Sequence, residues 1–141
     1  MPAKGSAEWH GDPGAGGSGT FTAGDSISGD YSFKSRFEDG PGANPEQLIA
    51  AAHAACFSMA LSAGLAGAGT PVDSVKTDAT VTIRFVDGVP TITSIALSTV
   101  GSVPGIDEAA FKAAAQGAKE GCPVSRALAG VPEITLEASL A

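Results

Sequence analysis

The stretch from Leu48 to Leu61 is apolar on every side of a helical wheel, apart from His53 and Ser58. Asn44 before it is a favoured N-cap, and a proline at the next position suits the first helical turn, where no N–H donor is needed. The pattern predicts a helix over about residues 45–63. Since its apolar side chains point in all directions, we expect this central helix to be buried all round.

Shorter segments before this helix predict strands. Residues 7–10 and 20–23 are expected to be two short strands, joined by a glycine-rich loop. In Tyr31–Phe37 the aromatic residues alternate with Lys34 and Arg36, which predicts a third strand. The three strands fall within about residues 7–37, and the last one brings Arg36 close to the start of the central helix.

The segments after the helix predict a hairpin, two helices and a strand. Apolar and polar residues alternate over about residues 77–100. Asp87-Gly88, a dipeptide typical of tight hairpin turns, interrupts this alternation. Residues 107–129 are expected to form two helices, and residues 133–140 a last strand. Helices that are segregated from mostly antiparallel sheets indicate the α+β class, in which the long buried helix is central and a second helix pair follows the hairpin.

Composition narrows the range of functions. The 141 residues carry a net charge of −7 with only eight Lys and Arg, which argues against nucleic acid and anionic membrane surfaces as partners. The first twelve residues contain no apolar signal segment, so the expected location is the cytoplasm. The uncharged run 48–68 is long enough to span a membrane, but it is mostly Ala, Gly and Ser and amphipathic strands follow it, which favours a core helix.

The two cysteines, Cys56 and Cys122, are the main candidates for chemistry. In a reducing compartment they could be inert thiols, metal ligands or a redox couple. A metal site is disfavoured because the two cysteines are 66 residues apart and do not form the Cys-x-x-Cys pair that structural zinc sites use. Cys122 should be the more acidic thiol, since it feels the dipole and the unpaired N–H groups at the start of a helix. Arg126, one turn further on, should also favour its thiolate. Burial should raise the pKa of Cys56 unless a cation from elsewhere reaches it.

Three motifs together resemble one family. The helix segment 44–61, the residues Ser35-Arg-Phe-Glu38 and the motif Gly121-Cys-Pro-Val-Ser125 closely resemble the OsmC branch of the OsmC/Ohr family of bacterial peroxide-reducing proteins. The similarity extends from about Trp9 to Leu140. It implies one OsmC-like domain over residues 1–141, assembled as an intertwined homodimer with its active sites at the subunit interface.

The resemblance also implies an activity and residue roles. Cys56 would be the peroxidatic thiol and Cys122 the resolving thiol, with Arg36 as the activating cation and Glu46 as the carboxylate that holds it. The expected enzyme is a peroxidase that reduces organic hydroperoxides to alcohols through a sulfenic acid and a disulfide, in oxidative or osmotic stress defence. An external dithiol, in this family typically a lipoyl protein, would reduce the disulfide, and no cofactor or metal is expected.

The residue types near the expected site suggest its substrates. A pocket lined by Phe37, Ile49, Phe57 and Met59 would be apolar, which favours alkyl or fatty-acid hydroperoxides over hydrogen peroxide.

Two other functions stay open at this point. His53 precedes Cys56 by three residues on the helix, and a Cys–His pair would suit a hydrolase. Alternatively, the chain is a binding or stress-structural protein in which both cysteines are inert core residues. His53 itself is expected to be a buried, hydrogen-bonded packing residue.

Overall fold

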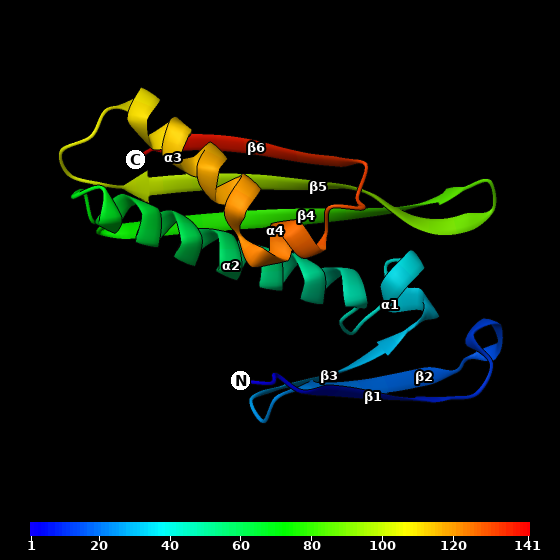
Figure 1. The fold of residues 1–141 in the computed structure, drawn as a ribbon. Coiled ribbons are helices and arrows are strands. Elements are labelled where there is room, and N and C mark those ends of the chain that lie inside the picture. The colour runs from blue at the N-terminus through cyan, green and yellow to red at the C-terminus, as the bar shows by residue number, and fades with distance from the viewer. The chain divides into compact units, whose positions relative to one another are not determined.

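The computed structural model describes residues 1–141, which form two compact units, Met1–Leu48 and Ile49–Ala141. The long helix α2 (Pro45–Gly67) begins in the first unit and continues in the second (Figure 1). The expected α+β class is confirmed, because the chain combines helices with two separate three-stranded sheets.

The first unit contains an antiparallel sheet in the order β1-β2-β3, formed by Gly5–His10, Ser18–Ala23 and Ile27–Ser32. A short 3-10 helix, η1 (Pro13–Ala15), lies in the glycine-rich connection between β1 and β2. Aromatic rings from the three strands contact one another on the sheet. The ring centroid of Tyr31 lies 5.4 Å from that of Trp9 and 6.3 Å from that of Phe21.

The prediction of a strand over residues 31–37 is wrong beyond Ser32, where the chain turns into helix α1 (Phe33–Phe37). Ser32 and Ser35 form a reciprocal capping box, in which each hydroxyl accepts from the other's backbone N–H at 3.2 and 2.8 Å. The rings of Phe33 and Phe37, four residues apart, then meet at a centroid distance of 5.0 Å. Local capping therefore prevails over the apparent two-residue alternation.

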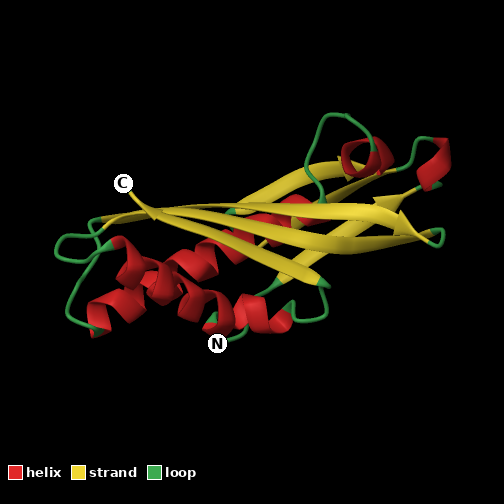
Figure 2. Ribbon diagram, turned by 90° about the horizontal axis from the view of Figure 1, so that it is seen from above, coloured by secondary structure: helices red, strands yellow, loops and turns green.

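The second unit places three helices against one sheet. Strands β4 (Ser74–Val86) and β5 (Val89–Ser102) are antiparallel, while β6 (Glu133–Leu140) pairs with β5 in parallel. Parallel pairing needs a crossover connection, which α3 (Glu108–Gly121) and α4 (Pro123–Ala127) supply. Figure 2 shows the helices packed on the sheet of long strands.

Alternate residues of β5 form the floor of the core. Ile95 and Leu97 are at most 1% exposed and belong to one cluster with residues of α2 and α3. The turn between β4 and β5 consists of Asp87 and Gly88, both with positive φ (51° and 79°). This conformation matches the twist of a two-residue hairpin, as the dipeptide predicted.

Helix α2 is buried on one side only, so the expectation that this chain buries it all round is wrong. His53, Phe57, Leu61 and Leu65, which follow one another at intervals of four, are at most 4% exposed. The opposite side is open, and Met59 is 76% exposed. By length and composition α2 could cross a membrane, but a single sheet and its neighbouring helix cover only part of it.

Gly101 of β5 allows the closest contact between the sheet and α3. A Cβ atom at this position would lie 2.4 Å from the ring of Phe111, which is fully buried. We expect Gly101→Ala to lower the free energy of unfolding by about 1–3 kcal/mol, because the ring has no room to move. Chemical denaturation would measure this loss. The control is Gly117→Ala on α3, where the added methyl group meets nothing and should be neutral or stabilising. Equal stabilities of the two variants would contradict the prediction.

Candidate functional site

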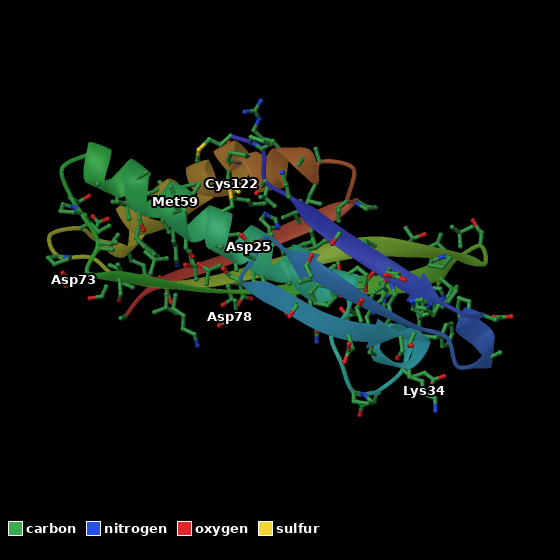
Figure 3. The ribbon with its side chains drawn as sticks, turned by 90° about the horizontal axis from the view of Figure 1, so that it is seen from below. Asp25, Lys34, Met59, Asp73, Asp78 and Cys122 are labelled. Atoms are coloured by element: carbon green, nitrogen blue, oxygen red, sulfur yellow. The ribbon has the colours of Figure 1, made fainter.

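The two cysteines lie side by side although they come from different helices. Cys56 is at the middle of α2, and Cys122 is the residue between α3 and α4, where Figure 3 labels it. Their sulfur atoms are 3.0 Å apart and both are free thiols. Cys122 is fully buried, whereas Cys56 is partly exposed. A reagent from solvent can therefore reach the sulfur of Cys56 first.

The surroundings of the two sulfurs shift their pKa values in opposite directions. Burial raises the pKa of Cys56, and its hydrogen bond with Cys122 raises it further. Burial would also raise the pKa of Cys122, but hydrogen bonds from Cys56, from the Ser125 hydroxyl and from backbone N–H groups outweigh burial and lower it. Cys122 is thus the more acidic thiol, as expected. The backbone N–H groups at the start of α4 contribute to this lowering, as expected, whereas Arg126 does not.

His53 lies behind this pair and is fully buried. Its Nε2 atom is 2.6 Å from the hydroxyl of Ser125, and no partner contacts its Nδ1. Burial lowers the pKa of His53, which favours the neutral ring. The expectation of a buried, hydrogen-bonded histidine is confirmed. Its hydrogen-bond partner is Ser125 and not Cys56, which removes the support for a Cys56–His53 hydrolase pair.

Arg36 and Glu46 form a second pair, within the first unit. The guanidinium donates from Nη2 to Oε1 of Glu46 at 2.8 Å and from Nε to the same oxygen at 3.0 Å. The side chain of Glu46 is 6% exposed and that of Arg36 is 37% exposed. A buried carboxylate that binds the fork of donors in this way fixes the orientation of the arginine. The expectation that Glu46 holds Arg36 agrees with this geometry.

Comparisons with known proteins identify the family. The family model described as OsmC-like protein matches residues 38–137. The chain is 48% identical to Peroxiredoxin OsmC of Escherichia coli over 97% of its own length and 95% of the relative's. The chain belongs to the OsmC-like family. It is also 36% identical to an organic hydroperoxide resistance protein of Xanthomonas axonopodis over 69% of the chain and 67% of the relative.

A solved structure of the family has the same fold. The crystal structure of an organic hydroperoxide resistance protein OsmC from Legionella pneumophila superimposes with a TM-score of 0.74 at 25% identity, covering 96% of each chain. The OsmC-like match of residues 38–137 includes Glu46, Cys56 and Cys122, while Arg36 lies just before it.

The residues from which an apolar pocket is predicted, Phe37, Ile49, Phe57 and Met59, differ in their burial. Phe57 is 0% exposed and belongs to the core cluster of the second unit. Met59 is two residues further along α2 and is 76% exposed, so these two side chains lie on different faces. Phe37 and Ile49 are partly buried and belong to different units. The helical period thus separates residues that are close in the sequence.

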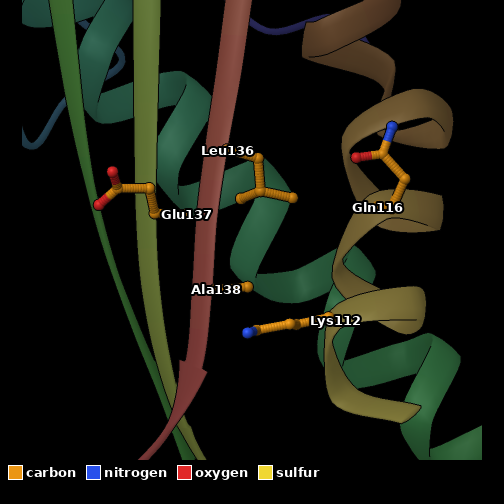
Figure 4. A pocket seen from close by; sticks show the side chains of 5 residues that line it. All are labelled: Lys112, Gln116, Leu136, Glu137 and Ala138. Atoms are coloured by element: carbon orange, nitrogen blue, oxygen red, sulfur yellow. The ribbon is translucent and has the colours of Figure 1, made fainter. Parts of the chain in front are cut away.

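Two hollows lie on the second unit. One, of about 380 Å³, lies between α2 and α3 and starts one helical turn from Cys56; only small residues line it, namely Ala60, Gly64, Ala114, Gly117, Ala118 and Gly121. The other, of about 350 Å³, lies between α3 and β6 and is lined by Lys112, Gln116, Leu136, Glu137 and Ala138 (Figure 4). No group of three His, Cys, Asp or Glu side chains could hold a metal ion.

Ser125 is the residue of the site that sequence reasoning missed. It is 7% exposed, and both its backbone N–H and its hydroxyl contact the sulfur of Cys122, at 3.4 and 3.5 Å. Its position three residues after a capping cysteine was the available signal, since the residue at that place donates its N–H to the cap. Its contact with His53 depends on the tertiary fold and could not be predicted from the sequence.

The buried His53 should make stability depend on pH. Because burial lowers its pKa in the folded protein, the unfolded chain binds a proton that the folded chain does not. This contribution to stability is complete above the ordinary histidine pKa of about 6.5 and decreases as the pH falls from there through the folded value. Between these values the slope is up to about 1.4 kcal/mol per pH unit. Urea unfolding between pH 4 and pH 8 should show a shallower acid slope for His53→Gln than for the unmodified chain, and equal slopes would contradict this.

Proposed function

We propose that this chain is a thiol peroxidase that reduces organic hydroperoxides to alcohols, through a sulfenic acid on Cys56 and a disulfide between Cys56 and Cys122. The observation that supports it most is the distance of 3.0 Å between the two sulfur atoms. The names of two relatives, Peroxiredoxin OsmC and organic hydroperoxide resistance protein, agree with this activity and with a role in peroxide stress.

The exposure of the two sulfurs supports the assignment of roles. A peroxide must reach the attacking thiolate in line with its O–O bond, and only Cys56 has any exposure. Cys122 is fully buried and can react only with what Cys56 brings to it. Cys56 is therefore the peroxidatic residue in this proposal, and Cys122 the resolving residue.

The reaction begins when the two sulfurs share a single proton, so that one of them is a thiolate. When that proton moves from Cys56 to Cys122 across the 3.0 Å contact, the Cys56 thiolate attacks the terminal oxygen of the hydroperoxide. An S–O bond forms, the O–O bond breaks, and an alkoxide leaves. The thiol proton of Cys122 passes to the alkoxide and gives the alcohol. Cys56 is then a sulfenic acid, and Cys122 is again a thiolate.

Formation of the disulfide between Cys56 and Cys122 completes the oxidation of the enzyme by the peroxide. Attack by Cys122 on the oxidised sulfur of Cys56 prevents further oxidation to sulfinic acid, which thiols do not reverse. A dithiol must then reduce the disulfide by thiol exchange. A lipoyl protein as this reductant is the expectation from the family resemblance, and a cytoplasmic location is the expectation from the sequence. Both stay predictions.

Arg36 has a proposed role in the first step. A guanidinium next to Cys56 would offset the burial that raises the pKa of this thiol, and it would stabilise the departing alkoxide. Glu46 supports the role by fixing the guanidinium through two hydrogen bonds to one carboxylate oxygen. This activation of Cys56 by Arg36 stays a prediction for measurement.

The substrate preference rests on the groove between α2 and α3. Its walls carry no charged side chain and nothing larger than a methyl group, so an alkyl substituent could lie there without leaving a buried polar group unpaired. This groove favours organic hydroperoxides over hydrogen peroxide, which is the preference also predicted from the apolar pocket of Phe37, Ile49, Phe57 and Met59.

One equivalent of tert-butyl hydroperoxide should oxidise both thiols of each reduced chain. Titration with a thiol reagent should show that both are lost and that dithiothreitol restores them.

Three variants test the roles of single residues. Cys56→Ser should abolish peroxide consumption, and Cys122→Ser should stop at one turnover with over-oxidation visible by mass spectrometry. Arg36→Ala should slow peroxide consumption by at least ~10-fold through the higher pKa of Cys56. Unchanged thiols in the reduced wild-type chain would overturn the proposed function.

The open face of α2 supports a homodimer. Around the exposed Met59 this face presents small apolar residues and no charge, among them Ala51, Ala52, Ala55 and Ala63. Apolar helix surface of this kind is normally covered in a water-soluble assembly, and alanine permits close approach of a second helix. A second copy of the chain is the occupant that the family resemblance implies, and we propose that it covers this face.

A charge on this face should prevent assembly. We expect Met59→Lys to convert a dimer to monomers, because a buried ammonium group without a partner is costly. Sedimentation equilibrium would measure the masses. The matched control is Lys76→Met, at an exposed position on the outer face of β4, which should leave the mass unchanged. A monomeric unmodified chain, or a dimeric Met59→Lys variant, would contradict the proposed dimer.

A further inference from the structure

A continuous series of polar contacts leads from a buried histidine to the two thiols. The imidazole of His53 contacts the hydroxyl of Ser125 at 2.6 Å, that hydroxyl contacts the sulfur of Cys122 at 3.5 Å, and this sulfur contacts Cys56 at 3.0 Å. His53, Ser125 and Cys122 are 0%, 7% and 0% exposed. The proposed peroxidase steps use the two cysteines and Arg36, so the buried histidine and serine have no part in them.

The direction of these hydrogen bonds follows from the unpartnered Nδ1 atom of His53. If Nδ1 carried the proton, a buried N–H donor would have no acceptor, which proteins avoid more strictly than an unused acceptor. The proton is therefore assigned to Nε2, which donates to the oxygen of Ser125. The hydroxyl proton of Ser125 is then free to donate to the sulfur of Cys122.

This orientation makes a chain of donors that ends on one sulfur. The backbone N–H of Ser125 adds a second donor to the same sulfur at 3.4 Å. Hydrogen bonds that point the same way strengthen one another in a buried environment, and they stabilise an anion at the end of the chain. No ionised side chain contributes to the shift at Cys122, so donors alone offset its burial.

We propose that His53 and Ser125 are positioning residues for the resolving step, which keep Cys122 as the thiolate that attacks oxidised Cys56. The proposal rests on the proposed function for the reaction itself. In this step the Cys122 sulfur forms the S–S bond, and the S–O bond of the Cys56 sulfenic acid breaks. The Cys56 sulfur is reduced and the Cys122 sulfur is oxidised. Hydroxide leaves and takes a proton from solvent.

The hydrogen-bond chain can be tested without any peroxide. In a Cys56→Ser background, which keeps a hydroxyl donor beside Cys122, the thiolate absorbance of the one remaining cysteine is followed against pH. We expect Ser125→Ala to raise the midpoint of the thiolate titration of Cys122 by about one pH unit, which leaves about tenfold less thiolate at neutral pH. His53→Leu should raise it as well, while His53→Gln should restore most of the effect, because its amide can donate to Ser125 without titrating.

Thr99→Val is the matched control, since it removes a buried hydroxyl that hydrogen-bonds only within the sheet. Its midpoint should equal that of the parent. Ser125→Ala removes a single oxygen atom, and circular dichroism would show whether each variant is folded. Midpoints of Ser125→Ala and His53→Leu that both equal the parent's would overturn the proposal. A midpoint in His53→Gln as high as that in His53→Leu would overturn the assigned direction of donation, because Ser125 would then need a base beside it and not a donor.

The resolving step itself is measured with both cysteines present. After one equivalent of tert-butyl hydroperoxide, we expect disulfide formation in Ser125→Ala to be about tenfold slower at neutral pH and to recover as the pH is raised. A purely structural defect would not recover with pH. If the unmodified chain forms no disulfide, the proposed function fails, while the titration in the Cys56→Ser background still decides whether the hydrogen-bond chain exists.

Discussion

The thiol site depends on the backbone at Cys122, the residue that ends α3 and caps α4. Its N–H donates to the carbonyl of Ala118 at 2.9 Å, and its carbonyl accepts from the N–H of Arg126 at 3.0 Å. Pro123 cannot continue α3, so the chain must turn here. With both backbone groups fixed, the sulfur takes the place of the usual capping oxygen and points at Cys56. The helix corner therefore decides which sulfur is buried.

The features that could be predicted from the sequence are those with a local physical cause. The start of α2 at Pro45, the Asp87-Gly88 turn and the cap at Cys122 each follow from a few neighbouring residues. The meeting of Cys56 with Cys122 was implied by family resemblance and not by any local pattern. The α+β class followed from adding such local signals together, whereas the parallel pairing of β6 with β5 required the tertiary structure.

The features that could not be predicted depend on a balance between local and distant contacts. Residues 31–37 alternate like a strand, but the paired hydroxyls of Ser32 and Ser35 stabilise a helix at the same place. Helix α2 looks uniformly apolar, and only the sheet decides that Phe57 faces the core while Met59 remains open. The contact of Ser125 with His53 could not be predicted, because the two residues are distant in the chain.

The faces of α2 explain why one helix can serve several purposes. Residues at intervals of four, such as His53 and Phe57, share the buried face, whereas Cys56 lies at its border and is partly exposed. If the cysteine stood at position 57, its sulfur would be sealed in the core. At position 55 it would lie on the open face, which we assign to a second copy of the chain. Successive residues of a helix point about 100° apart around its axis. Only the border position therefore keeps a sulfur within reach of both solvent and Cys122.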